Sequence, residues 1–227
     1  MNLTTIIILF IGTWAMMVPM FFQAKKYEVQ RWKIIPIAFA LTVAGTLGTY
    51  IWFFIENLSF GGRSFYGAVF FVPLVFLLLP YAIKMPYGQI MDFCAPAECI
   101  MLSFMKVQCL VTGCCAGRTL FVNELGEAVL FPSQLVELIA AYAIGMALMI
   151  LSMQEKHKEK IYPWYLILYG ASRFVLNFFR AEWELYSGGI PPLGTIWSVV
   201  AVAIGICWII YYNKKTQKTE EPEEIQE

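Results

Sequence analysis

The chain has 227 residues, of which 59% are hydrophobic and 14% are charged, and its mean hydropathy is +0.66. This composition excludes an ordinary soluble globular domain and indicates a membrane protein. The 16 basic and 16 acidic residues give a formal net charge of zero, and we expect no nucleic-acid partner.

Seven runs of mostly apolar residues are long enough to cross a membrane, because about 20 helical residues span roughly 30 Å of hydrocarbon. In chain order the runs are Leu3–Phe22, Ile34–Ile55, Tyr66–Ile83, Ile90–Leu110, Ser133–Leu151, Tyr162–Phe179 and Leu193–Tyr212. Helices satisfy their own backbone polar groups in lipid, so the sequence predicts an all-α fold, a polytopic bundle of about seven transmembrane helices. We assign residues 1–212 to one integral membrane domain and residues 213–227 to a charged tail that we expect to be disordered.

The distribution of lysine and arginine predicts the orientation of this bundle, since cytoplasmic loops are enriched in both. Eleven of the 16 cations follow the first, third, fifth or seventh run: Lys25, Lys26, Arg31, Lys33, Lys84, Lys156, Lys158, Lys160, Lys214, Lys215 and Lys218. The tail is therefore predicted to be cytoplasmic and the N-terminus to lie outside. The first run lacks a basic n-region and a small-x-small cleavage site, so we interpret it as a retained helix.

The other five cations lie on the outer side or near the outer ends of the runs: Arg63, Lys106, Arg118, Arg173 and Arg180. A cation near the membrane centre costs about 2.5 to 3.5 kcal/mol, so such residues face a partner or a polar cavity. Five of them near one leaflet suggest an anion. The alternative is that they pair with acidic residues as structural salt bridges or extend to the headgroups; the available acids are Glu56, Glu98, Glu137, Glu182 and Glu184.

The stretch CLVTGCCAGR, from Cys109 to Arg118, contains a match to the lipobox, the signal that marks a cysteine of a bacterial lipoprotein precursor for lipid attachment. No signal peptide precedes the match, so we interpret it as chance. What remains is a loop that leaves a membrane helix and ends in Arg118. Gly113 and Gly117 would let its backbone approach a ligand closely.

The chain has six cysteines and one histidine, His157. Because there is no CxxC pair and no second histidine, a zinc site is poorly supported, and we expect no metal and no cofactor. Adjacent Cys114 and Cys115 leave a strained vicinal disulfide as a weak redox alternative. His157 lies in a positively charged connector, where we expect no catalytic role.

The segment FPSQLVE opens the fifth run. A capping box would need an acid three residues after Ser133, but Val136 occupies that position, so capping does not explain Glu137. Gln134 and Glu137 are spaced i and i+3, and we expect both to point into the bundle. In the fourth run, Asp92 lies toward the cytoplasmic end and is interpreted as structural.

In YGASRFVLNFFR, four polar residues recur at helical spacing: Tyr169, Arg173, Asn177 and Arg180. The spacing predicts that they share one face of a helix that looks into the bundle. Two arginines supply forked donors suited to phosphate oxygens. This face is therefore predicted to be one wall of a phosphate-binding cavity.

The segments GGRSFYGA, DFCAPAECIMLSFMKVQCLVTGCCAGR, FPSQLVE and LYGASRFVLNFFR occur in this order. In order and spacing, from Gly61 to Arg180, they resemble the bacterial prolipoprotein diacylglyceryl transferases. The resemblance implies that residues 1–212 form a multi-pass transferase domain in the bacterial inner membrane, with its active site toward the outer leaflet. The implied reaction moves the diacylglyceryl group of phosphatidylglycerol to the lipobox cysteine of a prolipoprotein signal peptide and releases glycerol phosphate.

Several positions match the family as they stand: Gly113, Gly117, Arg118, Gln134, Glu137, Arg173 and Arg180. Others depart from it. Tyr66 stands where the family often has histidine, Lys106 replaces arginine, Cys109 asparagine, Cys114 glutamate, Val136 tyrosine and Asn177 an acid. The residues expected to handle phosphate are kept, whereas those expected to move protons are altered.

The implied mechanism needs stabilisation of a phosphate leaving group and a base for the thiol. Arg173 and Arg180, helped by Arg118 or Lys106, would supply the first. Tyr66, in a strong positive field, or Glu137 would supply the second, although Tyr66 is equally consistent with an aromatic anchor at the membrane interface. Two alternative functions remain: a related transferase with another acceptor, and a phospholipid-binding protein without catalysis. The runs show no internal repeat, which disfavours a transporter.

Overall fold

The computed structural model describes residues 3–59, 61–78, 85–184 and 191–220. Five of its helices are long and apolar enough to cross a membrane, which agrees with the predicted all-α membrane class. They are α1 (Leu3–Gln23), α2 (Arg31–Asn57), α5 (Tyr87–Thr112), α6 (Ser133–Ser152) and α9 (Leu193–Glu220).

Two shorter helices occupy the places of the other two expected spans. Helix α3 (Phe65–Val75) continues into the 3-10 turn η1 (Phe76–Leu78), and residues 79–83 of the predicted third span lie outside the described residues. Helix α7 (Ile161–Asn177) has 17 residues, so it ends two residues earlier than the predicted sixth span. Of the tail expected to be disordered, residues 213–220 continue α9 and residues 221–227 lie outside the described residues. Lysine and glutamine, which follow Tyr212, are good helix formers.

A β-hairpin that the sequence reading missed follows α5. Strands β1 (Thr119–Val122) and β2 (Ala128–Leu130) are antiparallel, with Val122 opposite Ala128. The turn has a recognisable chemistry: the side chain of Asn123 accepts the backbone N–H groups of Leu125 and Glu127, and Gly126 has a φ of 79°. Asparagine and glycine favour such turns, but a hairpin of so few residues gives little periodic signal.

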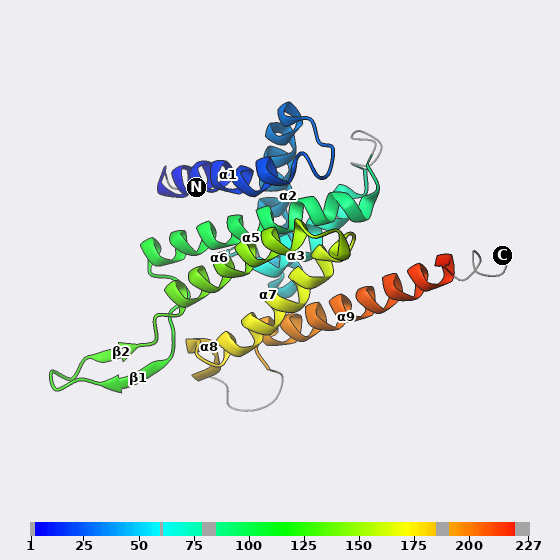
Figure 1. Ribbon diagram of the computed structural model, residues 1–227. Coiled ribbons are helices and arrows are strands. Elements are labelled where there is room, and N and C mark those ends of the chain that lie inside the picture. The colour runs from blue at the N-terminus through cyan, green and yellow to red at the C-terminus, as the bar shows by residue number, and fades with distance from the viewer. Residues whose placement is uncertain (1–2, 60, 79–84, 185–190, 221–227) are drawn as a thin grey trace, which may run out of the picture.

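Two of the connections that carry the predicted cytoplasmic cations lie at the same end of the bundle. Lys26, after α1, pairs with Glu155 in the 3-10 turn η2 (Glu155–His157) at 3.3 Å. Asp92 near the start of α5 accepts the backbone N–H groups of Ile161 and Tyr162, a structural role as expected. The hairpin and helix α8 (Ala181–Glu184) lie toward the opposite end, and in Figure 1 the C-terminal part of α9 points away from them.

Helix α5 forms the centre of the bundle. Eighteen of its 26 residues are buried, and it packs against α1, α6 and α7. The helices around it keep large apolar side chains on their outer surfaces, including Phe10, Phe39 and Ile139. In a membrane protein those outer faces meet lipid, which makes the polar residues of the interior the informative ones.

Glycines allow α2 and α3 to cross with their backbones in contact. A Cβ atom on Gly48 would lie 2.6 Å from the carbonyl oxygen of Gly67, whereas a Cβ on Gly45, one turn earlier, would meet nothing closer than 3.7 Å. We therefore expect Gly48→Ala to destabilise the protein by about 1 to 3 kcal/mol, the usual effect of overpacking. The matched variant Gly45→Ala should leave the thermal unfolding midpoint in detergent unchanged. Equal midpoints for both variants would show that the two helices separate at little cost.

Candidate functional site

The carboxylate of Glu137 is the centre of the polar interior. Lys106 and Arg173 both form ion pairs with it, and the Nη1 atom of Arg180 lies 3.0 Å from its Oε1. All four side chains are buried, with exposed fractions of 4% to 10%. Three of the five cations that the sequence singled out thus converge on one acid.

Each member of this group comes from a different segment. Lys106 lies on α5 and Glu137 one turn into α6, two helices that pack closely together, and Arg173 lies on α7. Helix α7 ends at Asn177, so the prediction that Arg180 shares its helical face is wrong. Arg180 instead reaches the group because its backbone pairs with Gly117 in an isolated β-bridge.

The bridge brings two distant parts of the chain side by side. The N–H of Arg118 donates to the carbonyl of Phe179 at 2.9 Å, and the N–H of Ala181 donates to the carbonyl of Ala116 at 3.2 Å. A side chain at Gly117 would collide with the carbonyl of Phe131. This glycine therefore permits close packing of the protein's own backbone, rather than the approach to a ligand that the sequence suggested.

The charges of the group do not cancel. Lys106, Arg173 and Arg180 carry three positive charges, whereas Glu137 and Glu182, the second partner of Arg180 at 2.8 Å, carry two negative ones. Burial opposes the charged form of Arg180, but Glu137 and Glu182 together raise the pKa of its guanidinium above the usual value. One positive charge therefore remains in excess. The salt bridges that the sequence analysis considered as an alternative to an anion site do form, but they do not neutralise all three cations.

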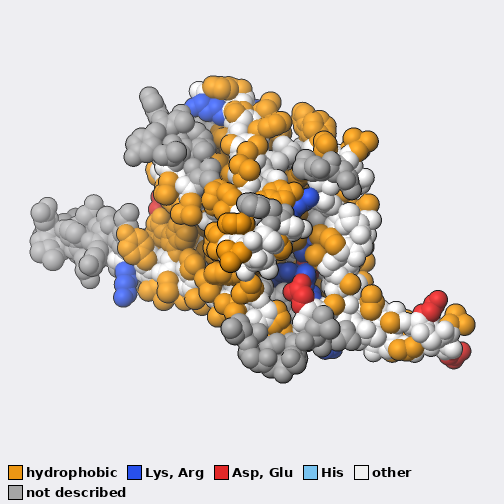
Figure 2. Space-filling model, turned by 180° about the vertical axis from the view of Figure 1, so that it is seen from behind, with side chains coloured by type: hydrophobic (Ala, Val, Ile, Leu, Met, Phe, Trp, Pro, Cys, Tyr) orange, Lys and Arg blue, Asp and Glu red, His pale blue; other side chains and the backbone are white. Residues whose placement is uncertain are grey.

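A polar cavity of 540 Å³ opens beside this group. Arg173, Arg180 and Arg63 line it together with Tyr66 and Cys115. Figure 2 shows basic and acidic side chains together in a hollow on this face of the molecule. The Nε atoms of Arg173 and Arg180 are buried and have no hydrogen-bond partner among the described residues, so both guanidinium groups retain donors. Because three arginines line it, the cavity is suited to an anion with a phosphate-like set of acceptors.

Tyr66 lies in the wall of the cavity, with its hydroxyl 2.6 Å from the Oγ atom of Ser198. Ser198 donates its own proton to the carbonyl of Gly194, also at 2.6 Å. Because a hydroxyl has only one proton, Tyr66 is the donor in the first bond. The chain of hydrogen bonds ends at a backbone carbonyl, which cannot take a proton onward.

Asn177 and Tyr169, the remaining members of the predicted stripe, are buried next to these groups. Asn177 Nδ2 donates to Ser198 Oγ at 3.3 Å, and the ring of Tyr169 packs edge-on against the ring of Tyr66, with centroids 6.1 Å apart. Their position on the inner face of α7 is as predicted. Neither is among the residues that line the 540 Å³ cavity.

Other predicted site residues lie apart from the charged group. Arg118 is exposed and stacks on the ring of Phe179, 5.0 Å from its centroid. Gln134 does not share the direction of Glu137; its Nε2 donates to the carbonyl of Cys114 at 2.8 Å. Gly113 ends α5 in the left-handed conformation, with a φ of 67°. Gln134 and Gly113 thus shape the loop between α5 and the hairpin.

That loop also brings three cysteines together. Cys109 in the last turn of α5 lies beside Cys114 and Cys115, and all three are free thiols. The hydrogen bond with Cys109, together with the nearby charges of Lys106 and Arg180, holds the pKa of Cys115 well below the usual range of a thiol. Sequence spacing gave no sign of this cluster. It likewise missed Ser198, a serine in the apolar helix α9.

Comparisons with known proteins agree with the resemblance drawn from the motifs. A model of the family described as prolipoprotein diacylglyceryl transferase matches residues 4–211. A phosphatidylglycerol–prolipoprotein diacylglyceryl transferase 2 of Clostridium perfringens is 27% identical over 162 residues, 67% of this chain and 62% of that protein. The chain thus spans less than two thirds of that relative.

Two further relatives carry the name phosphatidylglycerol–prolipoprotein diacylglyceryl transferase. That of Geobacter sulfurreducens is 24% identical over 80% of this chain and 77% of its own length. That of Acinetobacter baumannii is 25% identical over 77% of this chain and 73% of its own length. These matches extend beyond the motifs into the flanking helices.

Proposed function

The chain belongs to the prolipoprotein diacylglyceryl transferase family, and we propose that it transfers the diacylglyceryl group of phosphatidylglycerol to the lipobox cysteine of a prolipoprotein signal peptide. Glycerol phosphate is the other product. The transferase domain comprises residues 1–212, and the enzyme works in the bacterial inner membrane during lipoprotein maturation. Its N-terminus lies outside and its C-terminus in the cytoplasm, so that the cavity faces the outer leaflet.

The observation that carries this proposal is the excess of one positive charge in the group beside the cavity. The phosphodiester of phosphatidylglycerol has a single negative charge, which the excess offsets. Arg173 and Arg180 both line the cavity and keep unpaired donors. A forked guanidinium matches phosphate oxygens better than a lysine does. The apolar outer faces of the neighbouring helices suit the acyl chains of such a lipid.

In the proposed reaction the acceptor thiol loses its proton to water, and its sulfur forms a bond to the glycerol carbon that bears the phosphate. The bond from this carbon to the phosphate oxygen breaks, and its electron pair leaves with glycerol phosphate. Negative charge therefore grows on the leaving group in the transition state, where fixed cations stabilise it most. Arg173 and Arg180 supply this stabilisation, and Lys106 holds Glu137 from the opposite side.

Neither candidate base has a suitable arrangement for taking the thiol proton. Glu137 is held by three cations, which favour its carboxylate form strongly and make it a poor proton acceptor. Tyr66 keeps its own proton in the bond to Ser198. We assign Glu137 to positioning the cations and Tyr66 to shaping the cavity wall.

Mass spectrometry of a synthetic lipobox peptide, incubated with the purified protein and phosphatidylglycerol, tests the proposal. A diacylglyceryl mass gain on the cysteine peptide, absent from a serine peptide, is the expected result. Glycerol phosphate release without a gain on the peptide would assign the enzyme to another acceptor. Lipid binding with neither product would leave a phospholipid-binding protein and overturn the proposal.

The variant Tyr66→Phe distinguishes between two roles of Tyr66, a structural role and a role as the proton acceptor. We expect peptide modification to fall less than about tenfold, because the change removes one neutral hydrogen bond that contributes about 0.5 to 1.5 kcal/mol. Tyr162→Phe is the matched control, since its hydroxyl also makes one buried bond, to the carbonyl of Val69 at 2.7 Å, outside the cavity. A loss beyond a hundredfold in Tyr66→Phe alone would make Tyr66 the base.

A further inference from the structure

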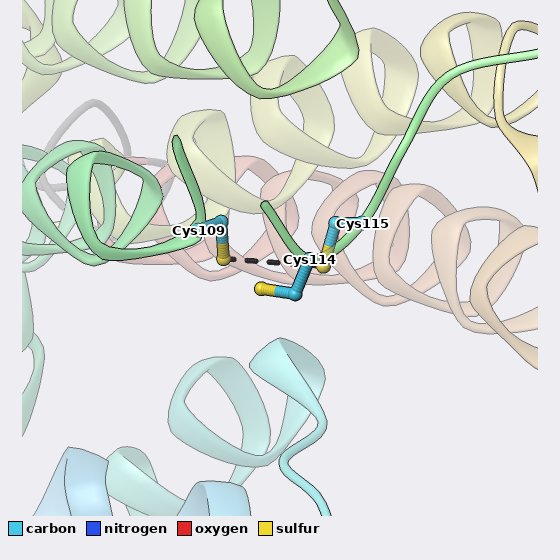
Figure 3. A group of neighbouring side chains, drawn as sticks. All are labelled: Cys109, Cys114 and Cys115. Atoms are coloured by element: carbon cyan, nitrogen blue, oxygen red, sulfur yellow. Dashed lines mark hydrogen bonds between the residues drawn. The ribbon is translucent and has the colours of Figure 1, made fainter. Parts of the chain in front are cut away.

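Three thiols meet at the outer end of α5 (Figure 3). The Sγ atoms of Cys109, Cys114 and Cys115 all lie within 4.8 Å of one another, and those of Cys109 and Cys115 are 3.9 Å apart. Two left-handed residues turn the chain back so that this happens: Gly113, with a φ of 67°, and Cys115, with a φ of 59°. A left-handed cysteine is uncommon and indicates that the surrounding contacts enforce the turn.

The loop that carries two of these thiols is hydrogen-bonded to the first turn of α6. Ser133 donates to the carbonyl of Cys115 at 2.7 Å, and Gln134 donates to the carbonyl of Cys114 at 2.8 Å. The third thiol is fixed because Cys109 is buried on the central helix. A set of side chains held in this way is pre-organised before any ligand arrives.

The dimensions of the cluster fit a thiophilic metal ion. A tetrahedral zinc ion with bonds of about 2.3 Å to sulfur needs sulfur atoms about 3.8 Å apart, close to the 3.9 Å between the sulfur atoms of Cys109 and Cys115. Thiolate ligands select soft ions over calcium or magnesium. Lys106 and Arg180 lie near these cysteines and stabilise negative charge on their sulfur atoms.

We propose that Cys109, Cys114 and Cys115 bind one Zn²⁺ ion, whose fourth coordination position takes the acceptor thiol. A site with three protein ligands and an open position is the arrangement of catalytic rather than structural zinc. Cys115 also lines the cavity that contains Arg173 and Arg180, so a thiol bound here lies beside the phosphate site. The inference rests on the proposed function for the identity of that thiol.

The metal would activate the acceptor thiol, a role that no side chain of the cavity described above fills. On coordination the acceptor thiol releases its proton to water, as metal binding to thiols generally does. The metal-bound thiolate then forms the sulfur–carbon bond, and the electron pair of the broken carbon–oxygen bond leaves with glycerol phosphate. No side chain has to accept the thiol proton, which accounts for the lack of a suitable base at Tyr66 and Glu137.

Titration of the reduced, metal-free protein with Co²⁺ tests the site directly. We expect one ion per chain, with sulfur-to-cobalt charge-transfer absorption and the intense visible bands of tetrahedral coordination. Cys109→Ser, Cys114→Ser and Cys115→Ser should each weaken binding at least tenfold, and Cys207→Ser, which alters an exposed cysteine on α9, should not. Absence of the bands, or their survival in the triple variant, overturns the site; so does a disulfide among the three cysteines in protein purified without reductant.

A second titration tests the open position independently of turnover. The cysteine lipobox peptide should shift the visible cobalt bands, and the serine peptide should leave them unchanged. Equal spectra with both peptides overturn the role of the metal in binding the acceptor. If the metal-free protein still modifies the peptide at the full rate, the inference fails and the proposed function stands; if the spectrum shifts but no lipid is transferred, the proposed function fails and the thiol site stands.

Discussion

Glu137→Gln is expected to destabilise the protein by about 3 to 5 kcal/mol, because it leaves three buried cations around a neutral amide. Removing one partner of a buried pair exposes the other to the full cost of desolvation. Here one carboxylate serves Lys106, Arg173 and Arg180 at once. For a chain of this size the change corresponds to a fall of about 10 °C in the unfolding midpoint, measurable in detergent by scanning calorimetry.

Glu182→Gln is the matched control for this prediction. Glu182 also pairs with Arg180, at 2.8 Å, but its side chain is 60% exposed. Exposed ion pairs contribute about 0 to 1 kcal/mol, so the midpoint should fall by no more than a few degrees. If Glu137→Gln were as stable as Glu182→Gln, the three cations would not depend on Glu137 for their burial, and the positioning role proposed for it would be wrong.

The sequence predicted the membrane class because hydropathy and backbone hydrogen bonding impose it on every span. It also predicted that the connection after α1 and the connection after α6 lie at the same end of the bundle, where Lys26 pairs with Glu155. It did not predict where α7 ends. The bridge between Gly117 and Arg180 joins residues far apart in sequence, and helical periodicity contains no information about such a contact.

Within the site, residue types were more predictable than their partners. A buried arginine in an apolar helix needs a counter-charge or an anion, which made Arg173 recognisable from its neighbours alone. Which acid it meets depends on how α6 and α7 pack. Gln134 and Glu137 illustrate the limit, since residues at i and i+3 lie near each other on a helix, yet Gln134 bonds to the loop at Cys114 and Glu137 to the cations.

The cysteines show the same limit more strongly. The spacing of Cys109 from Cys114 and Cys115 matches no common metal-binding pattern, and the sequence reading therefore expected no metal. The left-handed turn at Gly113 is what brings the loop back onto α5. A glycine after a helix is a recognised end signal, but the direction of the chain after it follows from the contacts of Ser133 and Gln134.

Arg173→Ala is expected to lower both glycerol phosphate release and peptide modification by about 10² to 10³, the usual effect of removing one donor that stabilises a developing oxyanion. The fold should survive, because Glu137 keeps Lys106 and Arg180 as partners. Arg173→Lys should recover only part of the rate, since a lysine keeps the charge but not the forked pair of donors.

Arg173→Ala and Glu137→Gln are expected to have different main effects. Removing the shared acid should impair stability first, whereas removing one of the three cations should impair the reaction and leave the unfolding midpoint within a few degrees. Arg31→Ala, which removes an exposed arginine at the start of α2, should change neither quantity. If Arg173→Ala released glycerol phosphate at the full rate, the excess charge beside the cavity would not be stabilising a phosphate leaving group, and the cluster would be structural alone.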